Sequence, residues 1–328
     1  MPGAAMPTLT GEALEALYER FNRRECVHPD PIEFLYDFAD PLDREIVGMV
    51  AASLAYGKVA HIMRSVGDAL ERMGVRSARV DAGSACTLAS PTDAGGTLKQ
   101  ELERGTPRKE KGSRVPRPSS CLGVPAGASP IMGVPTRPTE CLREASPESL
   151  ERVFAGFRHR FARGHELARL LLGLKRLIER HGSLGACFAS HLKAADETVA
   201  PALGPFVREF RAAADGLESH LLPDPSRGSA CKRLNLFLRW MVRRDEIDPG
   251  GWDGVSPARL IVPLDVHMHR ICGSLGLTKR AAADLRAALE ITAAFRAFDP
   301  DDPVRYDFAI SHLGIRGEGD ILLSQRDG

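Results

Sequence analysis

A lysine and an aspartate stand out as residues that could do chemistry together. Lys232 opens a predicted amphipathic helix directly after the small-residue turn Gly228-Ser229-Ala230, and Asp265 precedes another helical segment 33 positions after Lys232. The positive end of a helix dipole and neighbouring cations both disfavour an ammonium ion, so a lysine placed here could act as an amine nucleophile and form a Schiff base. The plainer interpretation is that Lys232 is only the solvated first residue of its helix.

Asp265 has two compatible interpretations. An Asp before a helix is a common N-cap, and a carboxylate held by helix N–H groups also stays ionised, ready to stabilise a cation or accept a proton from a lysine. One oxygen can cap the helix while the other faces a site. A metal-dependent hydrolase using Asp265, His267 and His269 is a third reading, but alternating residues fan out around a helix. We therefore predict no metal site and no cofactor.

The turn and the helix carry a local basic patch, although the chain as a whole is nearly neutral. The 328 residues hold 44 Lys plus Arg against 43 Asp plus Glu, so any nucleic-acid role must come from such a patch. Between Arg227 and Arg244 there are six cations and no anion. A helix N-terminus with free N–H groups beside a basic stripe is suited to phosphate.

Helical patterning predicts the elements that position these residues. Thr10 is expected to cap a helix over 11–21, and Asp40-Pro41 to open a helix that is apolar nearly all round and therefore buried. Further helices are predicted from residue 146 onward, including one through 149–161 and one capped by Thr278. Residues 260–264 are the one short strand candidate. The sequence therefore predicts an all-α fold.

One stretch differs from the rest. Residues 83–147 contain nine of the 23 prolines, among Gly, Ser and Thr, without apolar periodicity. Such a composition predicts a disordered insert. It would separate N-terminal helices over 1–82, which pack with the second lobe, from a helical domain over 148–328. Six cations and one anion in 104–117 indicate a solvated linker or, alternatively, a polyanion-binding arm.

The sequence also restricts the class of protein. No apolar run reaches the ~20 residues of a membrane span, and no secretory signal is recognisable at the N-terminus. The seven cysteines are odd in number and form no Cys-x-x-Cys pair, which argues against a zinc ribbon, an iron–sulfur cluster or a disulfide scaffold. We expect a soluble, cytoplasmic protein with no membrane partner.

Two motifs resemble a known superfamily. GSACK and VPLDVHM together resemble the helix-hairpin-helix (Gly/Pro-loop-Asp) DNA glycosylases, most of all the 8-oxoguanine branch, in which a Gly-x-Gly-x-Lys hairpin precedes a Pro-hydrophobic-Asp-x-His segment. ASLAYGKVAHI is similar to the buried N-terminal helix and turn of that fold. The chain is more similar still to a bacterial family of unknown function that carries KRLNLFLRWMVR, PLD-x-H and YDFA-x-x-x-LG. This resemblance covers most of 25–80 and 150–315.

The resemblance implies a two-lobed glycosylase-like fold and a DNA base-excision glycosylase with AP-lyase activity, located with the bacterial nucleoid. Lys232 would be the catalytic lysine and Asp265 the catalytic aspartate, acting through a Schiff base on a damaged purine in duplex DNA, with oxidised purines among the candidates. No protein partner is implied. The predicted DNA-binding residues are Arg227, Gly228, Ser229, Ala230, Arg233, Arg239, Arg243, His267 and Lys58. Candidates for an aromatic wall against the purine are Phe237, Trp240 and Trp252, of which Phe237 and Trp240 fit a core role better.

The sequence departs from the superfamily pattern in ways that keep another class of function open. Ala230 replaces the second hairpin glycine, and the spacing of 33 between the lysine and the aspartate is longer than in most glycosylases. A four-cysteine cluster is absent, which excludes an iron–sulfur member. The alternative is a non-catalytic nucleic-acid-binding protein on the same helical scaffold.

Overall fold

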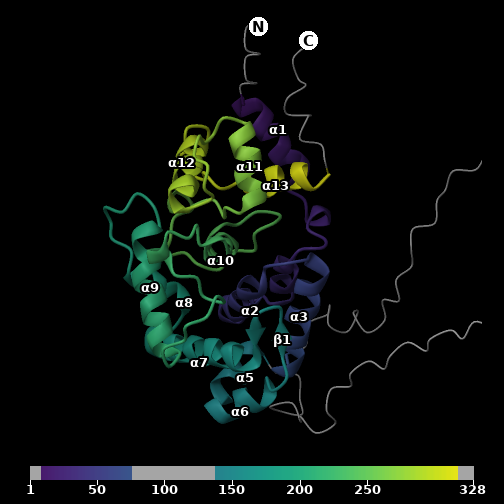
Figure 1. Ribbon diagram of the computed structural model, residues 1–328, viewed down its shortest axis with the longest axis vertical. Helices are drawn as coiled ribbons and strands as arrows, with labels where there is room; N and C mark the ends of the chain where they lie inside the picture. The colour runs from purple at the N-terminus through teal and green to yellow at the C-terminus, as the bar shows by residue number, and fades with distance from the viewer. Residues whose placement is uncertain (1–8, 76–136, 317–328) are drawn as a thin grey trace, which may run out of the picture.

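The computed structural model describes residues 9–75 and 137–316 and is mostly helical, which confirms the predicted all-α fold (Figure 1). The α-helices are α1 (Gly11–Phe21), α2 (Pro41–Leu54), α3 (Val59–Arg72), α5 (Pro138–Glu144), α6 (Pro147–Val153), α7 (Gly164–His181), α8 (Leu184–Ser190), α9 (Ala200–Ala213), α10 (Lys232–Val242), α11 (Val266–Ser274), α12 (Leu285–Arg296) and α13 (Asp307–Arg316). Short 3-10 helices are η1 (Arg24–Cys26), η2 (Pro31–Asp37), η3 (Pro225–Arg227) and η4 (Pro257–Arg259). Within the described ranges, no helix is both long enough and apolar enough to cross a bilayer.

The helices form two groups, one on either side of α10. Figure 1 shows α1 beside α11, α12 and α13 in one group, and α2, α3 and α5 to α9 in the other. Helix α1 packs on α13, and α2 packs on α10. The predicted N-terminal unit over 1–82 therefore contributes to both groups, because α1 and α2 lie in different ones.

The N-cap residues predicted from the sequence lie directly before helices α1 and α2. The Thr10 side chain accepts a hydrogen bond from the Ala13 N–H, and Asp40 accepts one from the Leu42 N–H, as predicted. Helix α2 is buried along most of its length because it packs against α3, α5, α10 and η2. Through α10, which begins at Lys232, α2 supports one side of the site described below.

Three local predictions were wrong. Thr278 does not cap α12; Asp284 does, through a hydrogen bond from the Ala287 N–H. Residues 260–264 are buried but not a strand, since they cross the core as a single extended segment. The helix expected over 149–161 ends at residue 153, and a hairpin of strands β1 (Arg158–His159) and β2 (Ala162–Arg163) follows.

Most of the predicted disordered insert lies outside the described residues, but its last part is folded. Residues 138–144 form α5, which begins at Pro138 and buries Cys141 and Leu142 against α2 and α7. Arg137, just before it, pairs with Asp43 on α2 at 2.7 Å. The insert prediction therefore extended too far, because a short helix needs only two or three buried side chains and shows no long period in the sequence.

A buried carboxylate ties α2 to the start of α8. Glu45 is 1 % exposed and accepts hydrogen bonds from the backbone N–H groups of Leu184 and Gly185 and from Trp252 Nε1, at 2.8, 3.3 and 2.9 Å. Burial raises the pKa of Glu45 to about 7, although these three donors oppose the shift.

We expect Glu45 to make the protein less stable as the pH rises. A carboxyl group whose pKa is higher in the folded state than in the unfolded state stabilises the fold below its unfolded pKa, and this contribution is lost as the pH rises through about 7. Between pH 5 and 8 the difference in unfolding free energy between wild type and Glu45→Gln should change by about 3 kcal/mol in favour of the variant. Urea denaturation at a series of pH values measures this, and parallel pH profiles would contradict it.

Candidate functional site

The turn before α10 has a tight and partly left-handed backbone. Gly228 has φ +76° and Cys231, the residue before Lys232, has φ 49°, while Ala230 keeps a negative φ. The Cys231 N–H donates to Ser229 Oγ at 3.1 Å, and Ser229 pairs with Asp284 at the start of α12. The left-handed residue of this turn is thus Cys231, one position after Ala230, which stands where the superfamily pattern has its second glycine. This turn aims Lys232 across the gap toward α11.

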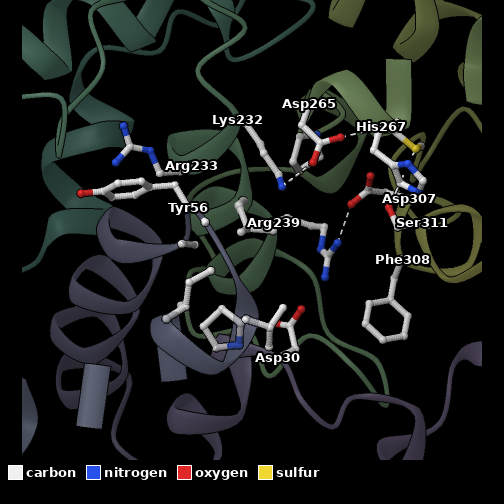
Figure 2. Close-up of a pocket in the computed structure, with 18 of the residues that line it drawn as sticks. Asp30, Tyr56, Lys232, Arg233, Arg239, Asp265, His267, Asp307, Phe308 and Ser311 are labelled. Carbon is white, nitrogen blue, oxygen red and sulfur yellow. Dashed lines mark hydrogen bonds and ion pairs between the residues drawn. The ribbon is translucent and has the colours of Figure 1, made fainter. Parts of the chain in front are cut away.

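Lys232 and Asp265 meet. Lys232 Nζ donates to Asp265 Oδ2 at 2.7 Å, and Asp265 Oδ1 accepts from the Met268 N–H at 2.8 Å (Figure 2). Asp265 is therefore both the N-cap of α11 and the partner of the lysine, so its two interpretations hold together. Both side chains are 38 % exposed, which leaves the pair accessible to a ligand.

The electrostatics of the pair keep the aspartate ionised. Burial alone would raise the pKa of Asp265, but the charge of Lys232, its hydrogen bond and the backbone N–H groups of Met268 and His267 together hold that pKa below its usual value. The carboxylate that pairs with the amine is also the nearest acceptor for its proton. An amine–carboxylate pair of this kind can support amine nucleophilic chemistry.

The pair lines a cavity of about 530 Å³ between the two groups of helices. This volume lies within the range of roughly 300–1,000 Å³ of small-molecule sites. The cavity is lined by Tyr56 and Arg233 on one side and by Asp307 and Phe308 on another, with Asp30 across from Lys232 (Figure 2). The lining combines apolar, aromatic and charged groups, as a site for a polar ring system requires.

Asp30 is a second carboxyl group in the cavity, which the sequence analysis missed. It caps η2 by accepting a hydrogen bond from the Ile32 N–H at 2.9 Å. Burial raises its pKa to about 6, against that hydrogen bond and the charges of Arg239 and Lys232. The Asp30-Pro31 dipeptide is a capping signal that could have revealed the helix start, although not the position of Asp30 in the cavity.

Two of the predicted DNA-binding arginines are not on the surface. Arg239 and Arg243 are each 3 % exposed. Arg239 pairs with Asp248 at 3.1 Å and Asp307 at 2.5 Å, and Arg243 pairs with Asp245, Asp248 and Asp302. The basic stripe read from residues 227–244 therefore does not exist as a free surface. Its counter-ions come from later segments, which the local charge count could not include.

The other predicted DNA-binding residues divide into two sets. Arg227, Gly228, Ser229 and Lys58 are exposed, while Ala230 is buried and its carbonyl oxygen accepts a hydrogen bond from Asn235 Nδ2. Ser229 and His267 line the cavity, and the buried Nε2 of His267 has no hydrogen-bond partner among the described residues.

Arg233 also lines the cavity, and both of its Nη atoms already donate to backbone oxygens. It donates to the backbone oxygens of Ser53, at 2.7 Å, and His220, and it lies over the Tyr56 ring. We therefore read Arg233 as a residue that holds the Tyr56 wall in place rather than as a phosphate contact.

The predicted aromatic wall is elsewhere. Phe237, Trp240 and Trp252 are all buried in the core, and Trp252 packs edge-on against Phe237 with ring centroids 5.2 Å apart. The core interpretation of Phe237 and Trp240 is correct, and Trp252 is a core residue too. The rings that line the cavity are instead Tyr56 and Phe308.

The metal alternative at this site does not have the required geometry. His269 Nε2 lies 3.0 Å from the carbonyl oxygen of Arg280, so that ring serves the fold. In the described part of the chain, the group of side chains close enough to share a metal ion is a different one, and does not include Asp265, His267 or His269. Asp265 instead uses its two oxygens for Lys232 and the helix N-terminus.

A hairpin next to the cavity was also missed. The β1–β2 turn presents Phe161, which is 72 % exposed, beside Arg160. Tyr56 Oη donates to the His159 backbone oxygen at 2.9 Å, which fastens the hairpin to the cavity wall. Gly57 follows Tyr56 and has φ +102°, and a side chain at this position would meet the Arg160 side chain of the hairpin. A glycine here therefore lets the hairpin pack close to the cavity wall.

The apolar side chains exposed around the cavity include more than Phe161. Val59 lines the cavity and is 41 % exposed, and Val266, next to Asp265, is 78 % exposed. The apolar periodicity of the sequence had predicted a helix where the hairpin lies. Each of its strands has only two residues, which is too short for the alternating pattern that identifies a strand.

Comparison with known proteins gives a family. No curated protein matches the chain, and no solved structure matches it. A family model described as "Protein of unknown function (DUF2400)" matches residues 30–88 and 128–316, which together span most of the chain and include Lys232, Asp265 and the hairpin. The chain therefore belongs to the DUF2400 family.

Proposed function

We propose that this protein is a DNA base-excision glycosylase and AP lyase that acts on a damaged purine through a Schiff base at Lys232, with oxidised purines as the first candidates. The observation that carries the proposal is the 2.7 Å contact between Lys232 Nζ and Asp265 Oδ2 in the wall of an open cavity. An amine beside a carboxylate that can take its proton is the arrangement that imine-forming enzymes need.

The reaction follows from the geometry of the pair. While ionised, Asp265 stabilises the positive charge that develops on the sugar as the bond from C1′ to the damaged base lengthens. Asp265 then takes a proton from Lys232, the neutral amine attacks C1′, and the base, which leaves with the electron pair of the broken bond, takes up that proton. The second amine proton moves to O4′ as the sugar ring opens to the protonated imine, and loss of a C2′ proton from this imine to solvent expels the 3′ phosphate.

The cavity and its surroundings support a substrate that enters from a duplex. A base cannot be reached inside the stack, so the nucleotide must rotate out, at a cost of a few kcal/mol that is least for a damaged pair. Val59 lines the cavity, Val266 directly follows Asp265, and the exposed Phe161 lies on the hairpin that Tyr56 holds. Lys58 and Arg227 are exposed cations in the turns before α3 and α10. Exposed apolar side chains together with exposed cations suit a surface that contacts both bases and phosphates.

A lesion panel tests the proposal. Duplexes that contain one oxidised purine, one alkylated purine, one abasic site or no damage are incubated with the wild type, and base release and strand cleavage are measured separately. We expect release from at least one damaged purine and cleavage of the abasic duplex, and neither reaction on undamaged DNA. Absence of both reactions on every duplex would contradict the proposal.

The alternative is a nucleic-acid-binding protein without catalysis. The departure of the turn from the glycosylase hairpin favours it, because Ala230 stands where that pattern has its second glycine. Salt-dependent binding to duplex DNA with no base release in the lesion panel would select this function.

Phe161 should contribute strongly to DNA binding. Stacking of a base on an aromatic ring is worth about 1–3 kcal/mol, so Phe161→Ala should weaken duplex affinity by roughly 5- to 150-fold. Fluorescence anisotropy at fixed salt measures this. Phe161→Trp should bind nearly as well as wild type, and Phe298→Ala, which removes another exposed ring on a different surface, is the matched control. Equal affinities for Phe161→Ala and wild type would contradict a stacking role.

A further inference from the structure

A second cluster of chemically active side chains lies on the junction of α7, α8 and α9. His181 is the last residue of α7, Cys187 lies in α8, His191 directly follows α8, and Glu209 lies in α9. None of the four lines the cavity that contains Lys232. The cluster therefore needs its own explanation.

The side chains converge on the Glu209 carboxylate. His181 Nε2 lies 2.8 Å from Oε1, His191 Nε2 lies 2.8 Å from Oε2, and Cys187 Sγ lies 3.9 Å from Oε2. One ligand atom each from His181, Cys187 and Glu209 falls within 4.8 Å of the others. Cys187 is fully buried, whereas the two His and the Glu side chains are each 21 % exposed, so the cluster is reachable from solvent.

We propose that His181, Cys187, His191 and Glu209 form a structural zinc site. Imidazole, thiolate and carboxylate are the ligands that Zn²⁺ takes in proteins, and four of them complete a tetrahedron. With zinc bonds of about 2.0–2.3 Å, neighbouring ligand atoms stand roughly 3–4 Å apart, so His181, Cys187 and Glu209 need only small side-chain shifts. His191, which now contacts Glu209 Oε2, would complete the set by moving toward the other two ligands. This site is independent of the function proposed for Lys232.

Binding exchanges one set of contacts for another. Zn²⁺ takes the place of the direct His–Glu hydrogen bonds, and Cys187 binds as the thiolate after releasing its proton to solvent. Arg180 Nη1, 2.9 Å from Glu209 Oε1, can keep its contact as an outer partner of the bound carboxylate. The ion would then join α7, α8 and α9, which pack against one another. A closed, four-ligand site at a helix junction is typical of structural zinc.

Metal analysis of the purified full-length protein tests the proposal. The protein is prepared without a metal-affinity tag, its zinc content is measured, and chelator-stripped protein is titrated with Zn²⁺ and with Co²⁺. We expect one high-affinity Zn²⁺ per chain, a Co²⁺ spectrum with a thiolate-to-metal band, and a rise in melting temperature on adding Zn²⁺ to the stripped protein. No saturable binding of either ion to the stripped protein would overturn the proposal, and the cluster would then be only a hydrogen-bonded hub around Glu209.

Variants assign the ligands. Cys187→Ser should remove the thiolate band and weaken Zn²⁺ binding by roughly tenfold or more, and His191→Gln should weaken binding while keeping the band. Cys26→Ser, which changes a partly exposed thiol outside the cluster, is the matched control and should behave as wild type. If Cys187→Ser does not fold, the Zn²⁺ affinity of His191→Gln and the Co²⁺ spectrum of the wild type still test the proposal. A wild-type thiolate band that survives in Cys187→Ser would place the metal elsewhere and overturn the proposal.

Discussion

Lys232→Gln is expected to abolish base release coupled to imine formation, with a rate loss of about 10³-fold or more, because Lys232 is the one lysine among the described residues that line the cavity. The variant should still fold. A glutamine amide can donate a hydrogen bond to Asp265 as the ammonium does, and the pair is 38 % exposed, so the fold depends little on it. Single-turnover base release on the preferred duplex measures the effect.

Two companion variants make this prediction specific. Asp265→Asn keeps a good helix cap but removes the proton acceptor, so we expect a rate loss of about 10²- to 10⁴-fold with little change in melting temperature. Lys193→Gln removes an exposed lysine between α8 and α9 and should keep the full rate. Unchanged turnover in Asp265→Asn would reduce that residue to a cap, and unchanged turnover in Lys232→Gln would exclude it as the nucleophile.

Asp248→Ala should produce the largest loss of stability. Asp248 is fully buried and accepts from both Arg239 Nε, at 3.1 Å, and Arg243 Nη1. Its removal leaves two buried guanidinium groups short of a counter-ion, which typically costs about 3–5 kcal/mol. Since Arg239 also holds Asp307 at the cavity wall, the variant should lose ligand binding together with stability. Urea denaturation of the wild type and the variant measures the cost.

An exposed pair nearby provides the control. Asp253 pairs with Arg244 at 3.3 Å, and these side chains are 88 % and 64 % exposed. Because exposed ion pairs contribute about 1 kcal/mol or less, Asp253→Ala should change the unfolding free energy very little. Comparable losses in the two variants would show that the buried network does not stabilise the fold as its geometry indicates.

The sequence was informative wherever chemistry is local. Thr10 and Asp40 cap helices as predicted because a cap needs only its own side chain and the next backbone N–H groups. Asp265 could be recognised as a cap for the same reason. Its contact with Lys232 could be expected only from the resemblance of two motifs, since nothing in a local pattern brings together residues 33 positions apart.

Longer-range relations account for the incorrect predictions. Arg239 and Arg243 resembled a free basic stripe because their partners lie outside residues 227–244. Asp245 and Asp248 follow that segment directly, and Asp302 and Asp307 lie some sixty residues later. Cys231, Asp30 and the hairpin that carries Phe161 have backbone or side-chain positions set by packing against distant elements. The cluster around Glu209 joins three helices and was not recognised, because its ligands do not share a short motif.

The most direct test of the central claim is borohydride trapping followed by peptide mapping. The wild type is incubated with duplex containing the preferred lesion, the imine is reduced, and the cross-linked peptide is identified by mass spectrometry. We predict one covalent adduct, on Lys232, that is absent from Lys232→Gln. A trapped adduct on another residue, or base release by the wild type with no adduct on Lys232, would contradict the account.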